Sequence, residues 1–166
     1  MIVILAGCDC SGKSTCFNKI DKSLGTFIKG VQMERFDTQF LSDLKQRAES
    51  DHLYIYDRSP IIDDFVYKPL FTGNMSDLFW MLDDVKDIIK KCTVLYFTCP
   101  QFVLEDRMRR RGDEYVNPKD IETIIKNYAV TFEILGLTPI KIPTDRLNTE
   151  QTLKKVMGVI ECTLQK

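Results

Sequence analysis

Short apolar segments alternate along the chain with longer segments in which apolar residues recur every three or four positions. Ile2–Ala6 is wholly apolar and ends at Gly7, which is the pattern of a strand buried on both faces. Residues 93–98 are rich in β-branched and aromatic side chains, which predicts another strand, and Pro100 ends it. Weaker strand patterns cover residues 27–33, 53–56 and 139–142. Helical patterns cover residues 13–22, 38–49, 76–91, 101–111, 119–135 and 150–164.

Strands and helices that alternate in this way predict an α/β fold, in which a parallel sheet lies between two layers of helices. The carboxyl ends of parallel strands share one edge of the sheet, and ligands bind in the crevice at that edge. A chain of 166 residues is the size of one domain, and no linker or repeat divides it. We therefore expect a single domain over residues 1–166.

The composition excludes several classes of protein. Hydrophobic residues make up 44% of the chain, charged residues make up 28%, and the formal net charge is -1. These values are typical of a soluble globular protein and provide no overall attraction to nucleic acid or to an anionic membrane. The apolar start of the chain is too short to cross a bilayer, and no export signal is present. We expect a cytoplasmic protein, in the host cytoplasm if it is viral, with no membrane partner.

Six cysteines and one histidine limit the chemistry further. Without an export signal, the cysteines are expected to be reduced thiols rather than disulfides. His52 is the only histidine, which argues against a Ser-His-Asp or Cys-His nucleophile. Cys8 and Cys10 have no matching second pair, so a structural zinc site is not expected.

The residues directly after the first strand, 7–15, read GCDCSGKST and form a complete G-x-x-x-x-G-K-[ST] phosphate loop. Its glycines allow backbone N–H groups and a helix amino terminus to converge on phosphate oxygens. Lys13 is expected to reach the β- and γ-phosphates, and the Ser14 hydroxyl to bind Mg²⁺. The residues expected to hold the phosphates of ATP are Gly7, Cys10, Ser11, Gly12, Lys13, Ser14 and Thr15.

A second motif, Tyr56-Asp57-Arg58-Ser59-Pro60, follows the strand over residues 53–56. It places an acid and an arginine at the sheet edge that carries the phosphate loop. Asp57 is suited to hold Mg²⁺ directly or through water, and Arg58 is suited to clamp a phosphate. The alternative is an Asp-Arg pair that only caps the following helix.

A third feature is the arginine-rich end of the helix over residues 101–111, which reads RMRRRGDE from Arg107 onward. Arg107 and Arg111 could stabilise the transferring phosphoryl group as this segment closes over a nucleotide. Cations in a last helical turn also interact with the helix dipole, so solvated arginines are the alternative.

Together these three motifs resemble those of the thymidylate kinase and deoxynucleoside kinase group of phosphate-loop kinases, over residues 1 to about 135. GCDCSGKST is similar to the thymidylate kinase loop G-x-D-G-x-G-K-S-T, except that Cys10 replaces a glycine. The resemblance implies a P-loop NTPase fold with a five-stranded parallel sheet, a short arginine-bearing lid at about residues 107–118, and phosphoryl transfer from ATP with Mg²⁺. It also implies that Asp9 approaches the sugar 3′-hydroxyl of the acceptor and that Arg58 holds the acceptor phosphate.

The acceptor distinguishes two activities within this group. A nucleoside kinase must deprotonate a 5′-hydroxyl, and Glu34 could supply the carboxylate for that step. A monophosphate kinase needs cationic clamps instead, for which Arg35 and Arg58 are candidates. The segment MERF over residues 33–36 therefore supports either activity, whereas Asp9 and the DRS motif favour the monophosphate kinase.

Thymidylate kinases usually carry a longer helical segment, with base-contacting aromatic and arginine residues, in the interval between Phe36 and the DRS motif. Only about twenty residues fill that interval here, so base recognition departs from the thymidylate kinase pattern. Several aromatic residues could stack a base or could belong to the core. These are Phe36, Phe40, Phe65, Tyr67 and Phe71. The short acceptor region suggests a phage-type enzyme, and apolar residues on helices after Asp57 could pair in a homodimer, as in the enzymes it resembles.

The sequence thus predicts a kinase that phosphorylates a deoxynucleoside monophosphate, with dTMP or a related pyrimidine nucleotide first. A deoxynucleoside kinase and a kinase that acts on DNA ends are the alternatives. A GTPase would need a guanine-reading N-K-x-D loop, which the chain lacks.

Overall fold

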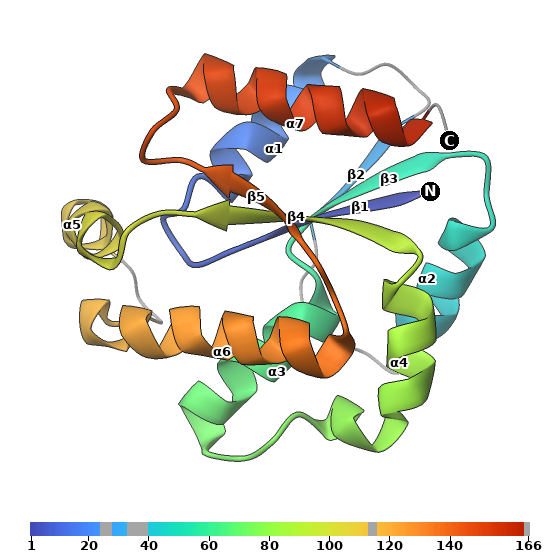
Figure 1. The fold of residues 1–166 in the computed structure, drawn as a ribbon, viewed down its shortest axis with the longest axis horizontal. Helices are drawn as coiled ribbons and strands as arrows, with labels where there is room; N and C mark the ends of the chain where they lie inside the picture. The colour runs from blue at the N-terminus through green and yellow to red at the C-terminus, as the bar shows by residue number, and fades with distance from the viewer. Residues whose placement is uncertain (24–27, 33–39, 113–115, 165–166) are drawn as a thin grey trace.

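Five parallel strands form one sheet in the computed structural model of the chain, which describes residues 1–23, 28–32, 40–112 and 116–164. The strands are β1 (Ile2–Ala6), β2 (Ile28–Gln32), β3 (Leu53–Asp57), β4 (Cys92–Thr98) and β5 (Ile140–Pro143). Their order in the sheet is β2-β3-β1-β4-β5, and each neighbouring pair is parallel. The predicted α/β class, with a parallel sheet flanked by helices, is confirmed (Figure 1).

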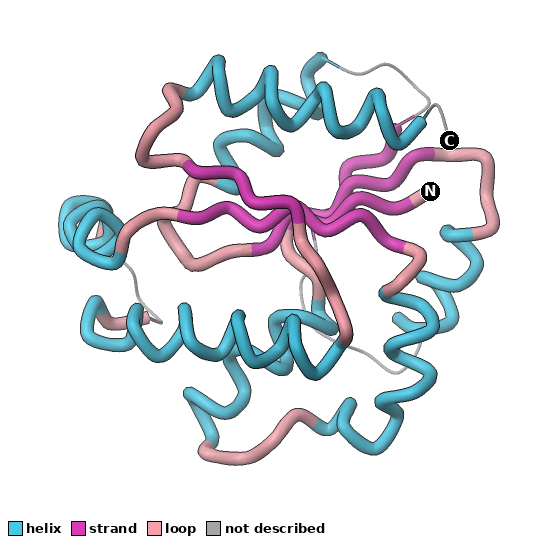
Figure 2. Tube along the Cα trace, in the orientation of Figure 1, coloured by secondary structure: helices cyan, strands magenta, loops and turns pink. Residues whose placement is uncertain are grey.

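Helices cover both faces of the sheet, so that the strands form the middle layer (Figure 2). The α-helices are α1 (Lys13–Ser23), α2 (Phe40–Ala48), α3 (Pro60–Thr72), α4 (Leu82–Ile89), α5 (Gln101–Arg111), α6 (Ile121–Leu135) and α7 (Thr149–Leu164). Two 3-10 helices, η1 (Asp77–Met81) and η2 (Pro118–Asp120), precede α4 and α6. Helices α1 and α7 cover one face, whereas α3 and α6 lie against the other (Figure 1).

The side chains of β1 alternate between the two layers. Ile2 and Ile4 pack in the core beneath α2, α3, α4 and α6, and Val3 and Leu5 pack in the core beneath α1 and α7. All four side chains are fully buried. Successive side chains of a strand point to opposite faces, so a central strand covered on both sides must be apolar throughout.

The prediction of one helix over residues 76–91 is wrong. The Ser76 hydroxyl accepts a hydrogen bond from the backbone N–H of Leu78 at 3.1 Å, and its carbonyl accepts one from Phe79 at 3.1 Å. These short-range bonds start the 3-10 helix η1. Met81 then has φ -118° and ψ 26°, outside the α region, so α4 begins only at Leu82.

The helical patterns in the sequence do not include α3. It packs beside α6 on the same face of the sheet, and six of its thirteen residues are buried, including Ile61, Ile62 and Val66. Apolar residues also occur outside its buried face, such as Phe71, so the apolar-polar period that identifies a surface helix is weak, and Pro69 obscures the pattern further. Parts of the predicted strand over 27–33 and helix over 38–49 lie outside the described residues.

Two further predictions concern the whole chain. None of the six cysteines, all of which lie in the described residues, forms a disulfide, as expected for reduced thiols. Among the helices that the structure describes, none is both long enough and apolar enough to cross a membrane.

Candidate active site

The phosphate loop joins β1 to α1 at the carboxyl edge of the sheet. Gly7 has φ +143°, and a Cβ atom at this position would lie 2.6 Å from the Phe97 carbonyl oxygen on β4. Only glycine fits this close approach, so the start of the loop is fixed by its neighbour in the sheet. Cys10 has φ 60°, a left-handed conformation, at the position where the loop that this sequence resembles has a glycine.

Lys13 lies beneath the loop and is buried. Its ammonium donates hydrogen bonds to the carbonyl oxygens of Gly7 and Cys8, the latter at 2.7 Å, and to the Ser11 hydroxyl at 3.4 Å. Burial and the nearby Arg58 charge lower the pKa of Lys13, while Asp9 and Asp63 oppose that shift. The loop backbone therefore holds this cation at the floor of the site.

Arg58 follows β3, which pairs directly with β1, so that Leu5 lies opposite Asp57. Arg58 has φ 82°, and strain of this kind is typical of functional positions. Its guanidinium forms an ion pair with Asp9 of the phosphate loop. The register of two neighbouring strands has thus brought both motifs into contact.

Asp9 is held from a second side by Tyr67 on α3, whose hydroxyl donates a hydrogen bond to its Oδ2 atom at 2.9 Å. Burial alone would raise the pKa of Asp9, but Arg58 and Lys13 outweigh burial and hold that pKa below its usual value. Asp9 therefore stays ionised in the site, with Arg58 as its counter-ion.

A second carboxylate, Asp63 on α3, lies 3.9 Å from the other side of the Arg58 guanidinium. The buried Tyr128 hydroxyl on α6 bonds to the Gly7 carbonyl at 2.8 Å and to Asp63 at 3.3 Å. Burial raises the pKa of Asp63 to about 6, although Arg58 and Lys13 act in the opposite direction. Asp63 and Tyr128 thus connect α3 and α6 to the base of the phosphate loop.

We expect Asp63 to make the protein less stable as the pH rises from about 4 to about 6. The folded state holds the Asp63 proton in this range while the unfolded chain, with an ordinary carboxyl pKa, releases it. Relative to Asp63→Asn, the wild-type free energy of unfolding should fall by about 2 kcal/mol across the range and stay level above it. Urea denaturation of both proteins at each pH measures this difference. A wild-type free energy of unfolding that changes with pH in the same way as that of Asp63→Asn would contradict this prediction.

The phosphate loop and three arginines enclose a cavity of about 290 Å³. Its lining residues are Asp9, Cys10, Ser11, Gly12, Lys13, Ser14, Thr15, Arg58, Arg107 and Arg111. Four cations and one carboxylate therefore surround a single space, and helix α1 points its amino terminus into it. This combination is suited to bind several phosphate groups.

The arginines at the end of α5 differ in their contacts. Arg107 donates to the Cys10 carbonyl at 3.3 Å and to the Thr144 carbonyl at 3.1 Å, so it joins the phosphate loop to the segment after β5. Arg109 and Arg110 pair with Glu105 and Asp106 one helical turn earlier, and all four of these side chains lie on α5 itself. Arg107 and Arg111 are the two that line the cavity.

A second cavity of about 360 Å³ adjoins the first beyond Arg107. The two cavities share four loop and helix residues, Cys10, Ser11, Gly12 and Thr15, together with Arg107. Its outer wall comes from the segment between β5 and α7 and from α7, and consists of Thr144, Leu147, Asn148, Thr149 and Thr152. Its lining is uncharged except for Arg107.

The residues predicted to hold Mg²⁺ fit that ion. The Asp57 Oδ1 atom is buried and has no hydrogen-bond partner among the described residues. Ser14 lines the phosphate cavity from the first turn of α1. Hydroxyl and carboxylate oxygens are the donors that Mg²⁺ prefers, with water and phosphate oxygens as its other ligands.

The structure brings together the predicted loop residues, Arg58, Arg107 and Arg111, whereas Glu34, Arg35 and Phe36 lie outside the described residues. Residues 113–115 of the predicted lid lie outside them too. Phe40 and Phe65 are buried in the core, so the core interpretation is right for these two. Tyr67 is also buried, and its hydroxyl serves Asp9.

Sequence reasoning missed Asp63, Tyr128 and the segment after β5. Asp63 lies four residues after Ser59 and looks like an ordinary first-turn acid of a helix. Tyr128 has the spacing of a core residue on α6, and nothing nearby in the sequence indicates its hydrogen bond to Gly7, 121 residues away. No local signal identifies either residue.

The chain is similar over nearly its whole length to a prophage-derived protein. No protein-family model matches the chain. The SPbeta prophage-derived uncharacterized protein YorR of Bacillus subtilis (strain 168) is 29% identical over 170 residues, covering 96% of this chain and 99% of that protein. Its prophage origin fits the expectation of a phage-type protein.

Several solved structures are similar to this chain in fold. The crystal structure of Bacillus subtilis YorR in complex with phosphorylated GDP has a TM-score of 0.77 and 25% identity, covering 100% of this chain and 99% of that one. Deoxyadenosine kinase from M. mycoides with bound dATP has a TM-score of 0.61 and 18% identity over 97% of this chain and 100% of its own. Polyphosphate kinase 2 from Arthrobacter aurescens TC1 has a TM-score of 0.65 and 15% identity over 96% of this chain and 68% of its own. These likenesses show that the chain shares the fold of these proteins, two of which are kinases, and they do not single out the thymidylate kinases.

Proposed function

We propose that this protein is a kinase that transfers the γ-phosphoryl group of ATP to a deoxynucleoside monophosphate and so forms the diphosphate. The observation that carries this proposal is the phosphate cavity, where Lys13, Arg58, Arg107 and Arg111 surround one space at the end of β1 and β3. Phosphoryl transfer requires little covalent chemistry from the protein, because positioning and charge neutralisation lower the barrier. Two phosphorylated substrates that meet in one cavity need this concentration of cations.

The donor nucleotide is assigned to both cavities. Its phosphates bind the loop over Lys13, and its base enters the second cavity, where the Arg107 guanidinium provides a flat surface for stacking. The hydrogen bonds of Arg107 to Cys10 and Thr144 hold the two parts of this site at a fixed separation. ATP is the expected donor.

Ser14 and Asp57 would hold Mg²⁺ beside the donor phosphates, the latter directly or through water. The ion, when bound, neutralises charge that develops on the phosphate oxygens. Asp57 is otherwise costly in this position, because its Oδ1 atom is buried without a partner among the described residues.

The acceptor is assigned to the side of the cavity formed by Arg58. Its phosphate would displace the Asp9 and Asp63 carboxylates from the Arg58 guanidinium, or would bind the guanidinium beside them. Arg35 is proposed to assist. Asp9, oriented by Tyr67, is proposed to accept a hydrogen bond from the acceptor sugar. The identity of the base, with dTMP or a related pyrimidine as the first candidate, is part of the proposal.

A deoxynucleoside is the second candidate acceptor. The observation in its favour is that carboxylates rather than further cations face Arg58, since Asp9 and Asp63 both lie beside it. The similarity in fold to a deoxyadenosine kinase agrees with this alternative. In this case Glu34 is the proposed base for the 5′-hydroxyl.

The test is release of ADP from Mg-ATP in the presence of a panel of acceptors. The panel contains the four deoxynucleoside monophosphates, the four deoxynucleosides and a short DNA duplex with 5′-hydroxyl ends. Turnover on one or more monophosphates, with the diphosphate identified by chromatography, supports the proposal and identifies the base. Turnover on deoxynucleosides alone establishes the second candidate, and turnover on DNA alone overturns both.

A further inference from the structure

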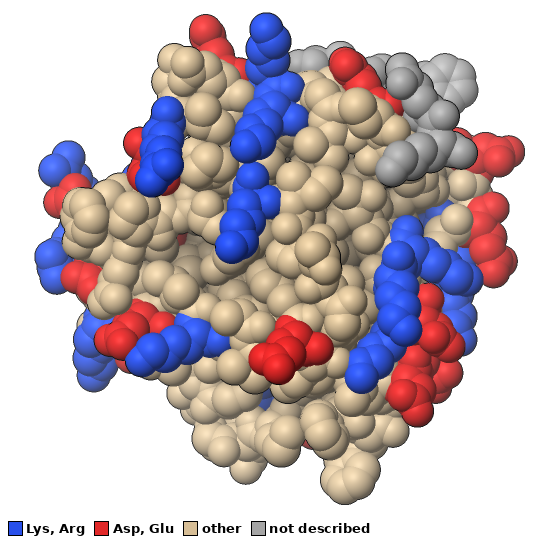
Figure 3. Space-filling view, in the orientation of Figure 1, with Lys and Arg blue, Asp and Glu red and all other residues tan. Residues whose placement is uncertain are grey.

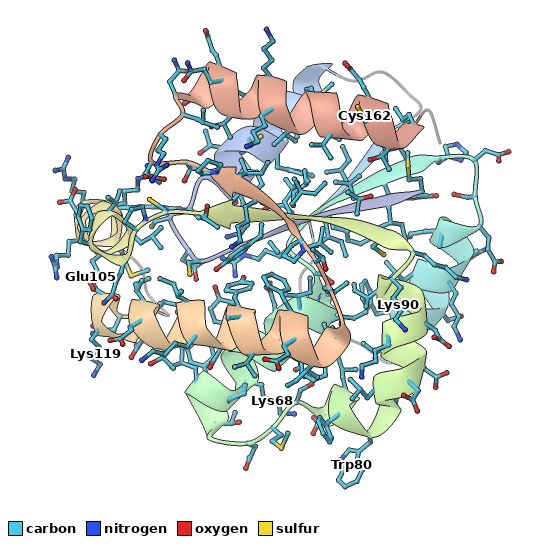
Figure 4. The ribbon with its side chains drawn as sticks, viewed as in Figure 1. Lys68, Trp80, Lys90, Glu105, Lys119 and Cys162 are labelled. Carbon is cyan, nitrogen blue, oxygen red and sulfur yellow. The ribbon has the colours of Figure 1, made fainter. Side chains whose placement is uncertain are left out.

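The outer wall of the second cavity is polar but carries no charge. No carboxylate is among the described residues that line this cavity. Lys, Arg, Asp and Glu are spread over the surface of the neighbouring helices α5 and α7 (Figure 3), so the wall differs from the surface around it. Glu105 on α5 lies on the side of that helix away from the connection between β5 and α7 (Figure 4). The described lining therefore contains no acidic side chain that would select one kind of base.

The side chain of Asn148, in this wall, has a fixed orientation. Its Oδ1 atom accepts a hydrogen bond from the Gln151 backbone N–H at 2.9 Å, and the Gln151 Oε1 atom accepts one from the Asn148 backbone N–H at 2.9 Å. A backbone N–H can only donate, so the Asn148 atom that faces it is the oxygen. The Asn148 side chain therefore offers a base its Nδ2 amine, which can only donate.

Thr144, at the other end of the wall, already has partners for its polar groups. Its backbone N–H donates to the Thr98 carbonyl at 2.9 Å, and its own carbonyl accepts from Arg107 at 3.1 Å. Its hydroxyl donates to the Thr98 carbonyl at 3.3 Å. Thr144 thus fixes the position of Arg107 rather than reading a base.

The polar side chains of the outer wall besides Thr144 are those of Asn148, Thr149 and Thr152. The Asn148 carbonyl accepts a hydrogen bond from the Thr152 backbone N–H at 2.9 Å, so this part of the backbone is occupied too. A base in this cavity would therefore meet one amine that donates and two hydroxyls that either donate or accept.

Adenine and guanine both satisfy this set of groups. Adenine presents an amine and guanine a carbonyl oxygen at the same position of the ring, and both present the N7 acceptor. Threonine hydroxyls can pair with either base, and the Asn148 amine finds an acceptor on either base. Strong discrimination arises where the wrong ligand leaves a buried polar group of the site unpaired. Neither purine does so here.

We propose that the donor site takes purine nucleoside triphosphates as a class and uses ATP and GTP about equally. This inference rests on the proposed function, in which the donor base enters the second cavity. The Arg107 guanidinium stacks on the flat face of either base, a contact that does not depend on the groups at the base edge. A carboxylate in the wall would favour guanine, and its absence from the described lining removes the selection but not the binding.

Nucleotide binding tests this inference without any acceptor. ATP and GTP, each with Mg²⁺, are titrated against fluorescent N-methylanthraniloyl ADP bound to the protein. The dissociation constants of ATP and GTP should agree within about 5-fold. A preference of about 30-fold or more for either purine would overturn the proposal.

Turnover with each donor separates this inference from the proposed function. Release of ADP from ATP and of GDP from GTP with the same acceptor supports both. Equal binding of the two nucleotides without turnover on any acceptor would support this inference and overturn the proposed function. Turnover with ATP alone, at a GTP concentration far above its dissociation constant, would overturn this inference and leave the proposed function standing.

Asn148→Asp tests whether the base contacts this wall. The carboxylate keeps an oxygen to cap α7 and replaces the donating amine with an acceptor, which suits the N–H groups of guanine. The ratio of the ATP dissociation constant to the GTP dissociation constant should therefore rise at least about 10-fold. A ratio equal to that of the wild-type protein would place the base elsewhere and overturn the proposal.

Asn74→Asp is the matched control for this variant. Asn74 is exposed and lines neither cavity, so the same change from an amide to a carboxylate should leave the ratio as it is in the wild-type protein. Circular dichroism should show that both variants are folded. A ratio that rises equally in Asn74→Asp would be a general effect of added negative charge and would overturn the assignment to Asn148.

Discussion

Replacing Lys13 by Ala should lower kcat/KM for phosphoryl transfer by about 100- to 1,000-fold. Lys13 is the buried cation at the floor of the phosphate cavity, and water that enters in its place cannot supply a fixed positive charge. Removal of one preorganised electrostatic contact to a transition state typically costs about 3 to 4 kcal/mol. Steady-state assays with saturating and limiting ATP measure the loss.

The control for this variant is Lys91→Ala. Lys91 is exposed and lies just before β4, at the opposite edge of the sheet from the site, so turnover should not change. Lys13→Arg should not restore activity, because a planar guanidinium does not fit among the loop carbonyls that hold the ammonium. Thermal unfolding checks that the variants are folded. A Lys13→Ala protein with normal turnover would remove the phosphate loop from the mechanism.

Arg58→Gln has the second large expected effect, and it should fall on the acceptor. Of the three arginines that line the phosphate cavity, Arg58 is the one that follows β3, and it contacts both Asp9 and Asp63. Without it, the acceptor phosphate loses its clamp, and the buried Asp9 carboxylate loses its counter-ion. We expect kcat/KM for the acceptor to fall by about 100-fold, with most of the change in the acceptor KM and little in the KM for ATP.

The KM for the acceptor and the KM for ATP together distinguish a role of Arg58 in binding the acceptor from a merely structural role. Arg109→Gln serves as the control, because Arg109 pairs with Glu105 on the exposed side of α5 and does not line the cavity. Arg58→Lys should recover only part of the loss, since one ammonium cannot replace a guanidinium that contacts two groups. An increase confined to the KM for ATP would place Arg58 on the donor side and contradict the assignment.

These predictions depend on contacts that the sequence reveals unevenly. The phosphate loop and the DRS motif are both predictable, because each follows a short apolar segment, and the ends of parallel strands share one edge. Their direct contact through Asp9 and Arg58 was not predicted, since it requires β1 and β3 to be neighbours with Leu5 opposite Asp57. Strand order is a property of the assembled sheet.

The contacts of the arginines at the end of α5 could not be predicted from the sequence either. The sequence identifies a cluster of cations, but only the geometry separates Arg109 and Arg110, paired along the helix, from Arg107 and Arg111, which line the cavity. Helical residues three or four positions apart share a face, so spacing alone could relate them to one another. It could not show which face meets the phosphate loop.

The sequence by itself determined the α/β class, the buried central strand and the phosphate loop, and it is the source of the phosphoryl-transfer proposal, because these depend on local patterns of apolar residues, glycines and charges. The tertiary structure alone decided that Tyr128 supports the Gly7 carbonyl, that Asp63 faces Arg58, and that Trp80 is exposed while neighbouring Leu78 is buried. These facts depend on which distant elements pack together. Burial and pairing between residues as far apart as 7 and 128 arise only when the layers assemble around the sheet.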